Sequence, residues 1–124
     1  MQTNKKGRVL LTNLRTGTNR LRIETGRWNK PYEPVQDRIC MSCMSGEVED
    51  EKHFLLHCTV YEHLRQKMYQ DIKMETSGIW RLEDMNPEEK WEILLRGTRD
   101  RHEKKVFEQV KLFVYKANKL RDRI

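Results

Sequence analysis

The chain has 124 residues, of which 36% are apolar and 35% are charged, and its formal net charge is +6. This length favours a single domain, and the low apolar content predicts a thin core that another interaction must help to stabilise. No apolar run approaches the roughly 20 residues of a membrane helix, and residues 1–6 lack the apolar stretch of a signal peptide. We therefore expect an intracellular protein, nuclear or cytoplasmic, with no membrane partner. The chain contains no GxxxxGK[ST] phosphate loop and no G-x-S-x-G nucleophile motif, which argues against two large classes of enzyme.

The positive charge is concentrated at the two ends of the chain. Residues 1–39 hold nine Lys or Arg against three acids, and residues 96–124 hold ten against four. Residues 40–62 hold one against five, and residues 63–95 hold five against seven. A polyanion would therefore meet the ends first. Solubility is a sufficient reason for the C-terminal charges, whereas the arginine-rich N-terminal block, with aromatic residues nearby, favours binding.

The segment before the cysteines predicts two helices and a loop. Residues 5–16 carry apolar side chains at helical spacing, and Gly17 suits the position just after a helix. Residues 18–25 predict a short helix that ends at Gly26. Two prolines follow closely, which predicts a loop because proline disfavours helix in the residue before it.

The three cysteines fit a metal site better than a disulfide framework. Cys40 and Cys43 form a C-x2-C pair, the usual first half of a tetrahedral zinc site, and Cys58 is the third thiol. His53 completes a C-x2-C-x9-H-x4-C pattern that uses every cysteine. We expect His57 to be a packing residue or a partner of a ligand, because adjacent residues rarely bind one ion without backbone strain.

Local signals around this pattern support the choice of His53. Asp50 is a good N-cap for a helix that carries His53 in its first turn. Thr59 and Glu62 predict a capping box that starts the next helix. Residues five apart on one helix differ by about 140° in direction, so a helix break at Cys58 lets both ligands reach one ion. We expect one structural zinc ion, because four protein ligands fill the tetrahedron and the H-E-x-x-H glutamate is missing.

The rest of the chain predicts three further helices. One follows residue 59, the second begins at Asn86-Pro87 and stops at Gly97, and the last covers residues 100–121. Trp80 and Leu82 are expected to anchor the connection between the first two. The predicted inward residues of the helices are Tyr61, Leu64, Met68, Ile72, Trp91, Leu94, Leu95, Val106, Val110, Phe113, Val114, Ala117 and Leu120.

These elements predict a mainly α fold in one domain. We expect a small helical bundle with an inserted CCHC zinc knuckle and a short β-turn or hairpin at the C-x2-C pair. The single domain 1–124 divides into a basic helical part (1–36), the knuckle (37–60) and the C-terminal helices (61–124).

Several short motifs occur in a familiar order. They are LRTG at 14–17, LRIETGRW at 21–28, RIC-x2-C at 38–43, GEVEDE at 46–51 and HFLLHC-x2-Y at 53–61. Together they resemble the zinc-binding C-terminal region of reverse transcriptases from non-long-terminal-repeat (LINE-type) retrotransposons. The tail, with FVYKA at 113–117, is similar to the way such polyproteins end.

The resemblance implies the same four zinc ligands and contact with template RNA or target DNA near a polymerase domain. It does not imply polymerase activity, because Asp71 lacks the neighbouring second aspartate of the polymerase motif, and we expect no upstream polymerase chain. We therefore expect no catalysis, in either an excised domain or a standalone descendant.

Two functional interpretations remain. In the first, the module binds single-stranded or structured nucleic acid, with Trp28 and Tyr32 stacking on bases. The second is a protein-interaction module that docks on a polymerase domain or a host protein; neither takes a small-molecule substrate. Trp28 is equally well explained as an apolar plug beside the knuckle, and some arginines are expected to pair with the acidic 47–51 stretch. The residues expected to contact phosphate are Arg15, Arg20, Arg22, Arg27, Lys30 and Arg38.

Overall fold

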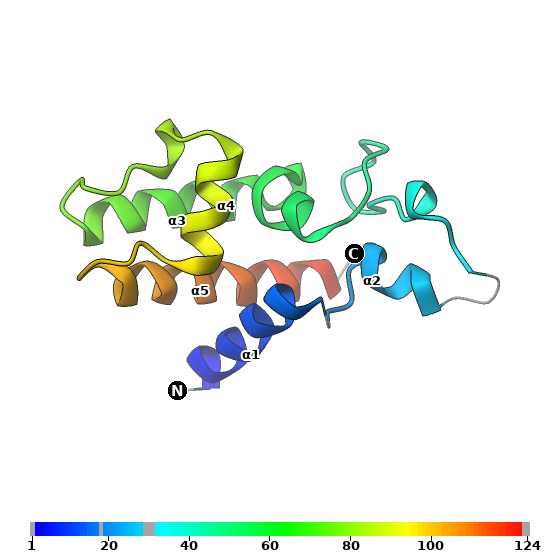
Figure 1. Ribbon diagram of the computed structural model, residues 1–124, viewed down its shortest axis with the longest axis horizontal. Coiled ribbons are helices and arrows are strands. Elements are labelled where there is room, and N and C mark those ends of the chain that lie inside the picture. Colours follow the sequence, from blue (N-terminus) through cyan, green and yellow to red (C-terminus); the bar gives the residue numbers. More distant parts are fainter. Residues whose placement is uncertain (1, 18, 29–31, 123–124) are drawn as a thin grey trace.

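The computed structural model describes residues 2–17, 19–28 and 32–122, and within them the protein is mainly α-helical without a β-strand (Figure 1). The α-helices are α1 (Gln2–Thr16), α2 (Arg22–Thr25), α3 (Glu62–Glu75), α4 (Pro87–Arg96) and α5 (Glu103–Asp122). A π-helical turn, η3, covers His53–His57. Short 3-10 turns cover Gly26–Trp28, Val35–Asp37, Thr59–Tyr61 and Leu82–Asp84.

Helix ends with strong local signals lie where the sequence predicts them. The Asn86 side chain accepts a hydrogen bond from the Glu89 backbone N–H at 2.9 Å, so it caps α4 just before Pro87. Gly97 ends α4 with φ +95°, and Gly17 follows α1 with φ +72°. Both conformations favour glycine because a Cβ is disfavoured at positive φ. The short helix predicted over residues 18–25 begins only at Arg22, since Leu21 is extended.

Helix α5 lies at the centre of the bundle, with α1 packed on one side and α3 on the other (Figure 1). Its predicted inward residues are buried, apart from the partly buried Leu120. At the crossing of α1 with α5, the backbone of Gly7 lies so close to Lys111 that an added Cβ would meet the Lys111 carbonyl oxygen at 2.7 Å. The two basic ends of the chain therefore lie side by side, which no local signal in the sequence indicates.

The segment around the cysteines departs from two details of the prediction. Instead of a hairpin with strands, an isolated antiparallel bridge joins Ile39 to Val48. The two carboxylate oxygens of Glu62 accept hydrogen bonds from the Arg65 and Gln66 side chains rather than completing a capping box with Thr59. The 3-10 turn that contains Thr59 leads directly into α3, so the helix starts close to the predicted place by a different local geometry.

Candidate metal centre

Cys40, Cys43, His53 and Cys58 come together as the sequence predicts. One ligand atom from each lies within 4.8 Å of the others. The Sγ atoms of Cys40 and Cys58 are 3.9 Å apart, and Cys43 Sγ is 3.3 Å from His53 Nε2. Two thiolates at about 2.3 Å from one tetrahedral ion would be about 3.8 Å apart. The four side chains therefore fit a tetrahedral metal ion.

Three local structures place these ligands. Next to the Ile39–Val48 bridge, the Cys40 backbone N–H donates a hydrogen bond to the Glu47 carbonyl at 2.8 Å. This bond closes the loop that carries Cys43. Asp50 acts as the predicted cap, because its Oδ1 accepts from the His53 backbone N–H at 2.7 Å. Cys58 lies just after the π-turn in an extended conformation, with φ −62° and ψ 123°.

The π-turn lets His53 and Cys58 reach the same ion. The Cys58 N–H donates to the His53 carbonyl at 2.7 Å, an i→i+5 bond that widens the turn by one residue. The wider turn and the extended Cys58 bring both side chains to one side of the segment. The predicted break at Cys58 is confirmed, whereas the π-turn before it has no signature in the sequence analysis.

Glu47 orients the histidine. Its Oε2 is 3.0 Å from His53 Nδ1, so the ring presents Nε2 to Cys43. A carboxylate on the far nitrogen fixes the tautomer of a metal-binding histidine and increases its basicity. His57, predicted to be a packing residue or a partner of a ligand, is exposed. The acidic GEVEDE string between Cys43 and His53 is the signal that could have indicated Glu47.

The thiols differ in their electrostatic environment. Burial raises the pKa of Cys58 to about 12. Burial also raises the pKa of Cys43, but hydrogen bonds involving Ser45, Cys40 and His53 outweigh it and lower the pKa to about 6. Cys40 and Cys58 are almost fully buried, whereas Cys43 is partly exposed. A cation held by the four side chains would compensate for the cost of holding buried thiolates.

The loop that carries the ligands is attached to both ends of the chain through Glu49. This carboxylate, with a side chain only 3% exposed, accepts hydrogen bonds from Arg121 Nε at 2.9 Å and Nη2 at 2.8 Å. It also accepts from the Arg22 backbone N–H at 2.8 Å, while the Glu49 carbonyl accepts from the Ile23 N–H at 2.9 Å. The hydrogen bonds to Glu49 raise the pKa of Arg121. Arginine pairing with the acidic stretch therefore occurs, through a residue outside the predicted set.

The residues expected to bind nucleic acid occupy different environments. Arg20, Arg27 and Tyr32 are exposed, although Arg27 pairs with Glu24 at 2.8 Å. Arg22 is partly buried and forms an ion pair with Glu33 at 2.7 Å. Of these three arginines, Arg20 is exposed, whereas the guanidinium groups of Arg22 and Arg27 form ion pairs.

Arg15 and Arg38 make tertiary contacts. The Arg15 Nε–H donates to the Leu95 carbonyl at 2.8 Å, and its guanidinium carbon lies 5.0 Å from the centre of the Phe107 ring. Arg38 is 2% exposed and donates to the carbonyls of Glu33 and Ile23, so it supports the loop instead of facing solvent. The Trp28 side chain and Lys30 lie outside the described residues, and their predicted roles stay predictions.

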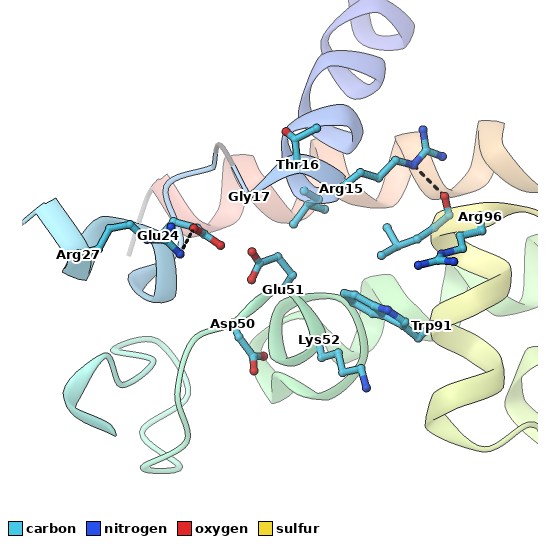
Figure 2. Close-up of a pocket in the computed structure, with 12 residues that line it drawn as sticks. Arg15, Thr16, Gly17, Glu24, Arg27, Asp50, Glu51, Lys52, Trp91 and Arg96 are labelled. Carbon is cyan, nitrogen blue, oxygen red and sulfur yellow. Dashed lines mark hydrogen bonds and ion pairs between the residues drawn. The ribbon is translucent and has the colours of Figure 1, made fainter. Parts of the chain in front are cut away.

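A cleft of about 700 Å³ lies beside the loop, between α1, α2, residues 50–52 and α4 (Figure 2). Glu24 and Glu51 turn toward one another inside it, and Trp91 lies on its α4 side (Figure 2). Burial, with Glu24 as a hydrogen-bond partner, raises the pKa of Glu51 to about 7. The cleft is also lined by the cations Arg15, Arg27, Lys52 and Arg96, so positive charge surrounds the two carboxylates at its centre.

Comparisons with known protein families, curated proteins and solved structures find no match to this chain. Among the described residues, every helix is too short or too polar to cross a lipid bilayer. The fold and the Cys3His cluster therefore carry the functional argument by themselves.

Proposed function

We propose that this chain is a non-catalytic nucleic-acid-binding module whose shape is maintained by one structural zinc ion. Three thiolates and one imidazole at tetrahedral spacing are a donor set that zinc prefers. The ligands would be Cys40, Cys43, His53 and Cys58, with Glu47 orienting the histidine. Because the protein supplies all four ligands, no coordination position is left for a substrate or an activated water.

The observation that carries the binding proposal is that two exposed arginines are attached to the metal loop, the segment over residues 38–49 that carries Cys40 and Cys43. Arg20 and Arg27 lie on either side of α2, which Glu49 holds against the loop through the Arg22 and Ile23 backbone. Fixing the loop with a metal ion therefore also fixes the arginines. Phosphates of the nucleic acid would bind Arg20 and Arg27, with Arg15 at the end of α1 extending the surface.

Tyr32 adds a stacking surface to these cations. It is 63% exposed, and the Arg38 guanidinium carbon lies 5.1 Å from its ring centre. Unpaired bases stack on exposed aromatic rings, so single-stranded or structured RNA suits this surface better than a DNA major groove. The motif resemblance to retrotransposon reverse transcriptases favours the same ligand, either template RNA or target DNA.

The binding proposal is tested by titrating a labelled single-stranded RNA into the zinc-loaded protein by fluorescence anisotropy. We expect the affinity to fall steeply with salt, with a log–log slope of about −0.7 for each neutralised phosphate. The double variant Arg20→Glu/Arg27→Glu should lose most of the affinity. The matched control Arg81→Glu/Arg99→Glu changes the charge equally at exposed residues in the loops that flank α4. An affinity that does not change with salt, or an equal loss in both variants, would contradict the proposal.

A further inference from the structure

A second surface lies away from the metal centre, where α1 crosses α5. The two helices form a groove of about 610 Å³ whose walls are residues 5–10 and residues 115–122. The close contact between the Gly7 backbone and Lys111 holds the walls near one another. The groove therefore depends on the packing of the two ends of the chain, and not on the metal loop.

The floor of the groove is apolar. Val9 is 51% exposed although it is an aliphatic residue in the middle of a helix. Leu10 lies next to it, partly buried against the core, and Tyr115 forms the opposite wall. Val9, Leu10 and Tyr115 thus form an apolar lining between the two packed helices, with Val9 as its exposed part, and a lining of this kind suits a third helix.

The rim of the groove is cationic. Lys5, Lys6 and Lys119 are exposed and line it, and Asp122 is the acidic residue among the lining side chains. The Lys119 ammonium lies 5.0 Å from the centre of the Tyr115 ring. This charge is complementary to an occupant with acidic flanks.

The same contacts favour a protein helix over a nucleic acid. Tyr115 is partly buried, unlike the 63%-exposed Tyr32, so it offers less ring surface on which a base could stack. Val9 offers no aromatic surface and instead matches an aliphatic side chain. We propose that the α1–α5 groove is the docking site for an acidic amphipathic helix of a partner protein. Leucine-type residues of the partner would contact the floor, and its glutamates or aspartates would pair with the lysines.

This proposal is independent of nucleic-acid binding and is tested with a defined probe. The probe is a fluorescein-labelled helical peptide of about 16 residues, with leucines along one face and glutamates flanking them. The control peptide has the same composition with its leucines distributed around all faces. Both are titrated into the full-length, zinc-loaded chain by fluorescence anisotropy, and an oligothymidine of roughly 20 nucleotides is titrated in parallel.

Three variants test separately the apolar floor, the cationic rim and the effect of lysines outside the groove. Val9→Glu should weaken binding of the leucine-faced peptide by about tenfold, because it places a charge on the apolar floor. Lys5→Glu/Lys6→Glu should weaken it by about fivefold. The matched pair Lys104→Glu/Lys105→Glu lies on exposed positions of α5 outside the groove and should change it by less than about twofold. Each mutated side chain is exposed, so the fold should persist, as circular dichroism would verify.

The proposal is supported if only the leucine-faced peptide binds and if Val9→Glu weakens that binding without changing oligothymidine affinity. It is overturned if both peptides bind equally, if neither binds, or if Val9→Glu has no effect. It is also overturned if the Lys104/Lys105 pair is as damaging as the Lys5/Lys6 pair. A loss of oligothymidine binding in Val9→Glu would assign the groove to nucleic acid instead.

Discussion

The loop that carries the metal ligands and the helical bundle are ordered by different interactions. In the bundle, Ile72, Leu94, Val106 and Val110 are fully buried, and apolar packing between helices is the main source of stability. The loop over residues 38–49 buries few apolar side chains, since Met41 and Met44 are 67% and 81% exposed, and its order comes from backbone hydrogen bonds, the buried carboxylate of Glu49 and the ligand cluster. Apolar packing therefore stabilises the helical bundle, whereas polar contacts order the loop.

Aromatic and cationic side chains connect the two regions. The Phe54 ring centre is 5.1 Å from that of Tyr61 and 6.2 Å from that of Phe113. Buried Arg65 of α3 donates to the carbonyls of Leu55 and Phe54, which lie in the π-turn. The loop is therefore coupled to the bundle. Mutations that are meant to destabilise only one of the two regions must lie away from these contacts.

The largest effect is expected from removal of a metal ligand. Structural zinc ions contribute about 10–16 kcal/mol of apparent binding energy at neutral pH, so His53→Ala should unfold residues 38–58. Hydrogen exchange read by mass spectrometry should show rapid exchange there, while α3 and α5 remain protected. Lowering the pH of the wild type should release the ion as well, because the thiolates and the imidazole must be deprotonated to bind it.

The neighbouring histidine is the control for that experiment. His57→Ala removes an exposed imidazole next to Cys58 and should leave both the metal content and the exchange pattern unchanged. Full protection of residues 38–58 in metal-free His53→Ala would show that the loop folds without an ion, which would remove the distinction between the two regions.

A core truncation should disturb the bundle and spare the metal centre. Ile72→Ala removes a fully buried side chain from α3 and should lower the free energy of unfolding by about 2–5 kcal/mol, measured by urea titration. The metal content should stay at one ion per chain. Met74→Ala, at a position 74% exposed in the same helix, should change stability by less than about 0.5 kcal/mol. Loss of metal in Ile72→Ala under native conditions would mean that the two regions fold as one unit.

The Glu49–Arg121 pair tests the connection between the regions. Arg121→Ala leaves a buried carboxylate without its cation and should cost about 3 kcal/mol of folding stability. Lys116→Ala, at an exposed position of the same helix, is the control and should have little effect. A cost below about 0.5 kcal/mol would show that solvent replaces the arginine.

The smallest expected effect concerns the orientation of His53. Glu47→Ala removes the carboxylate at 3.0 Å from Nδ1 and should weaken metal affinity by about tenfold to a hundredfold. Competition with a chromophoric chelator measures this change, and saturating zinc should restore the fold. Glu75→Ala, at the exposed end of α3, should leave the affinity as it is. Unchanged affinity in Glu47→Ala would show that the ring is oriented by packing alone.

The features predicted correctly are those encoded within a few residues of each other. Asn86 caps the start of α4 with its side chain, Gly97 ends the helix at a positive φ, and Asp50 caps the turn that carries His53. The apolar spacing of residues 106–117 is enough to identify the buried face of α5. Each of these signals acts locally, so no knowledge of the rest of the chain was needed.

The features that were missed depend on side-chain contacts that form only when the chain folds, some of them between residues five or six positions apart. Arginine at position 38 has the same chemistry as an exposed phosphate ligand, and only its burial against Ile23 and Glu33 distinguishes it. Glu47 is one of several acidic residues between Cys43 and His53, and only the folded loop shows that its carboxylate is the one next to the His53 ring. Two carbonyls of the π-turn, those of Phe54 and Leu55, accept hydrogen bonds from Arg65, a contact that no spacing within the turn indicates.

By itself, the sequence determined which four side chains cluster as candidate metal ligands, and most helix boundaries, because cysteine spacing and capping chemistry are properties of short segments. Only the tertiary structure decided which cations face solvent, which carboxylate supports His53, and that the two basic ends meet along α1 and α5 to form a groove. These outcomes follow from how helices pack, and packing depends on the shapes of side chains that the chain brings together over long distances.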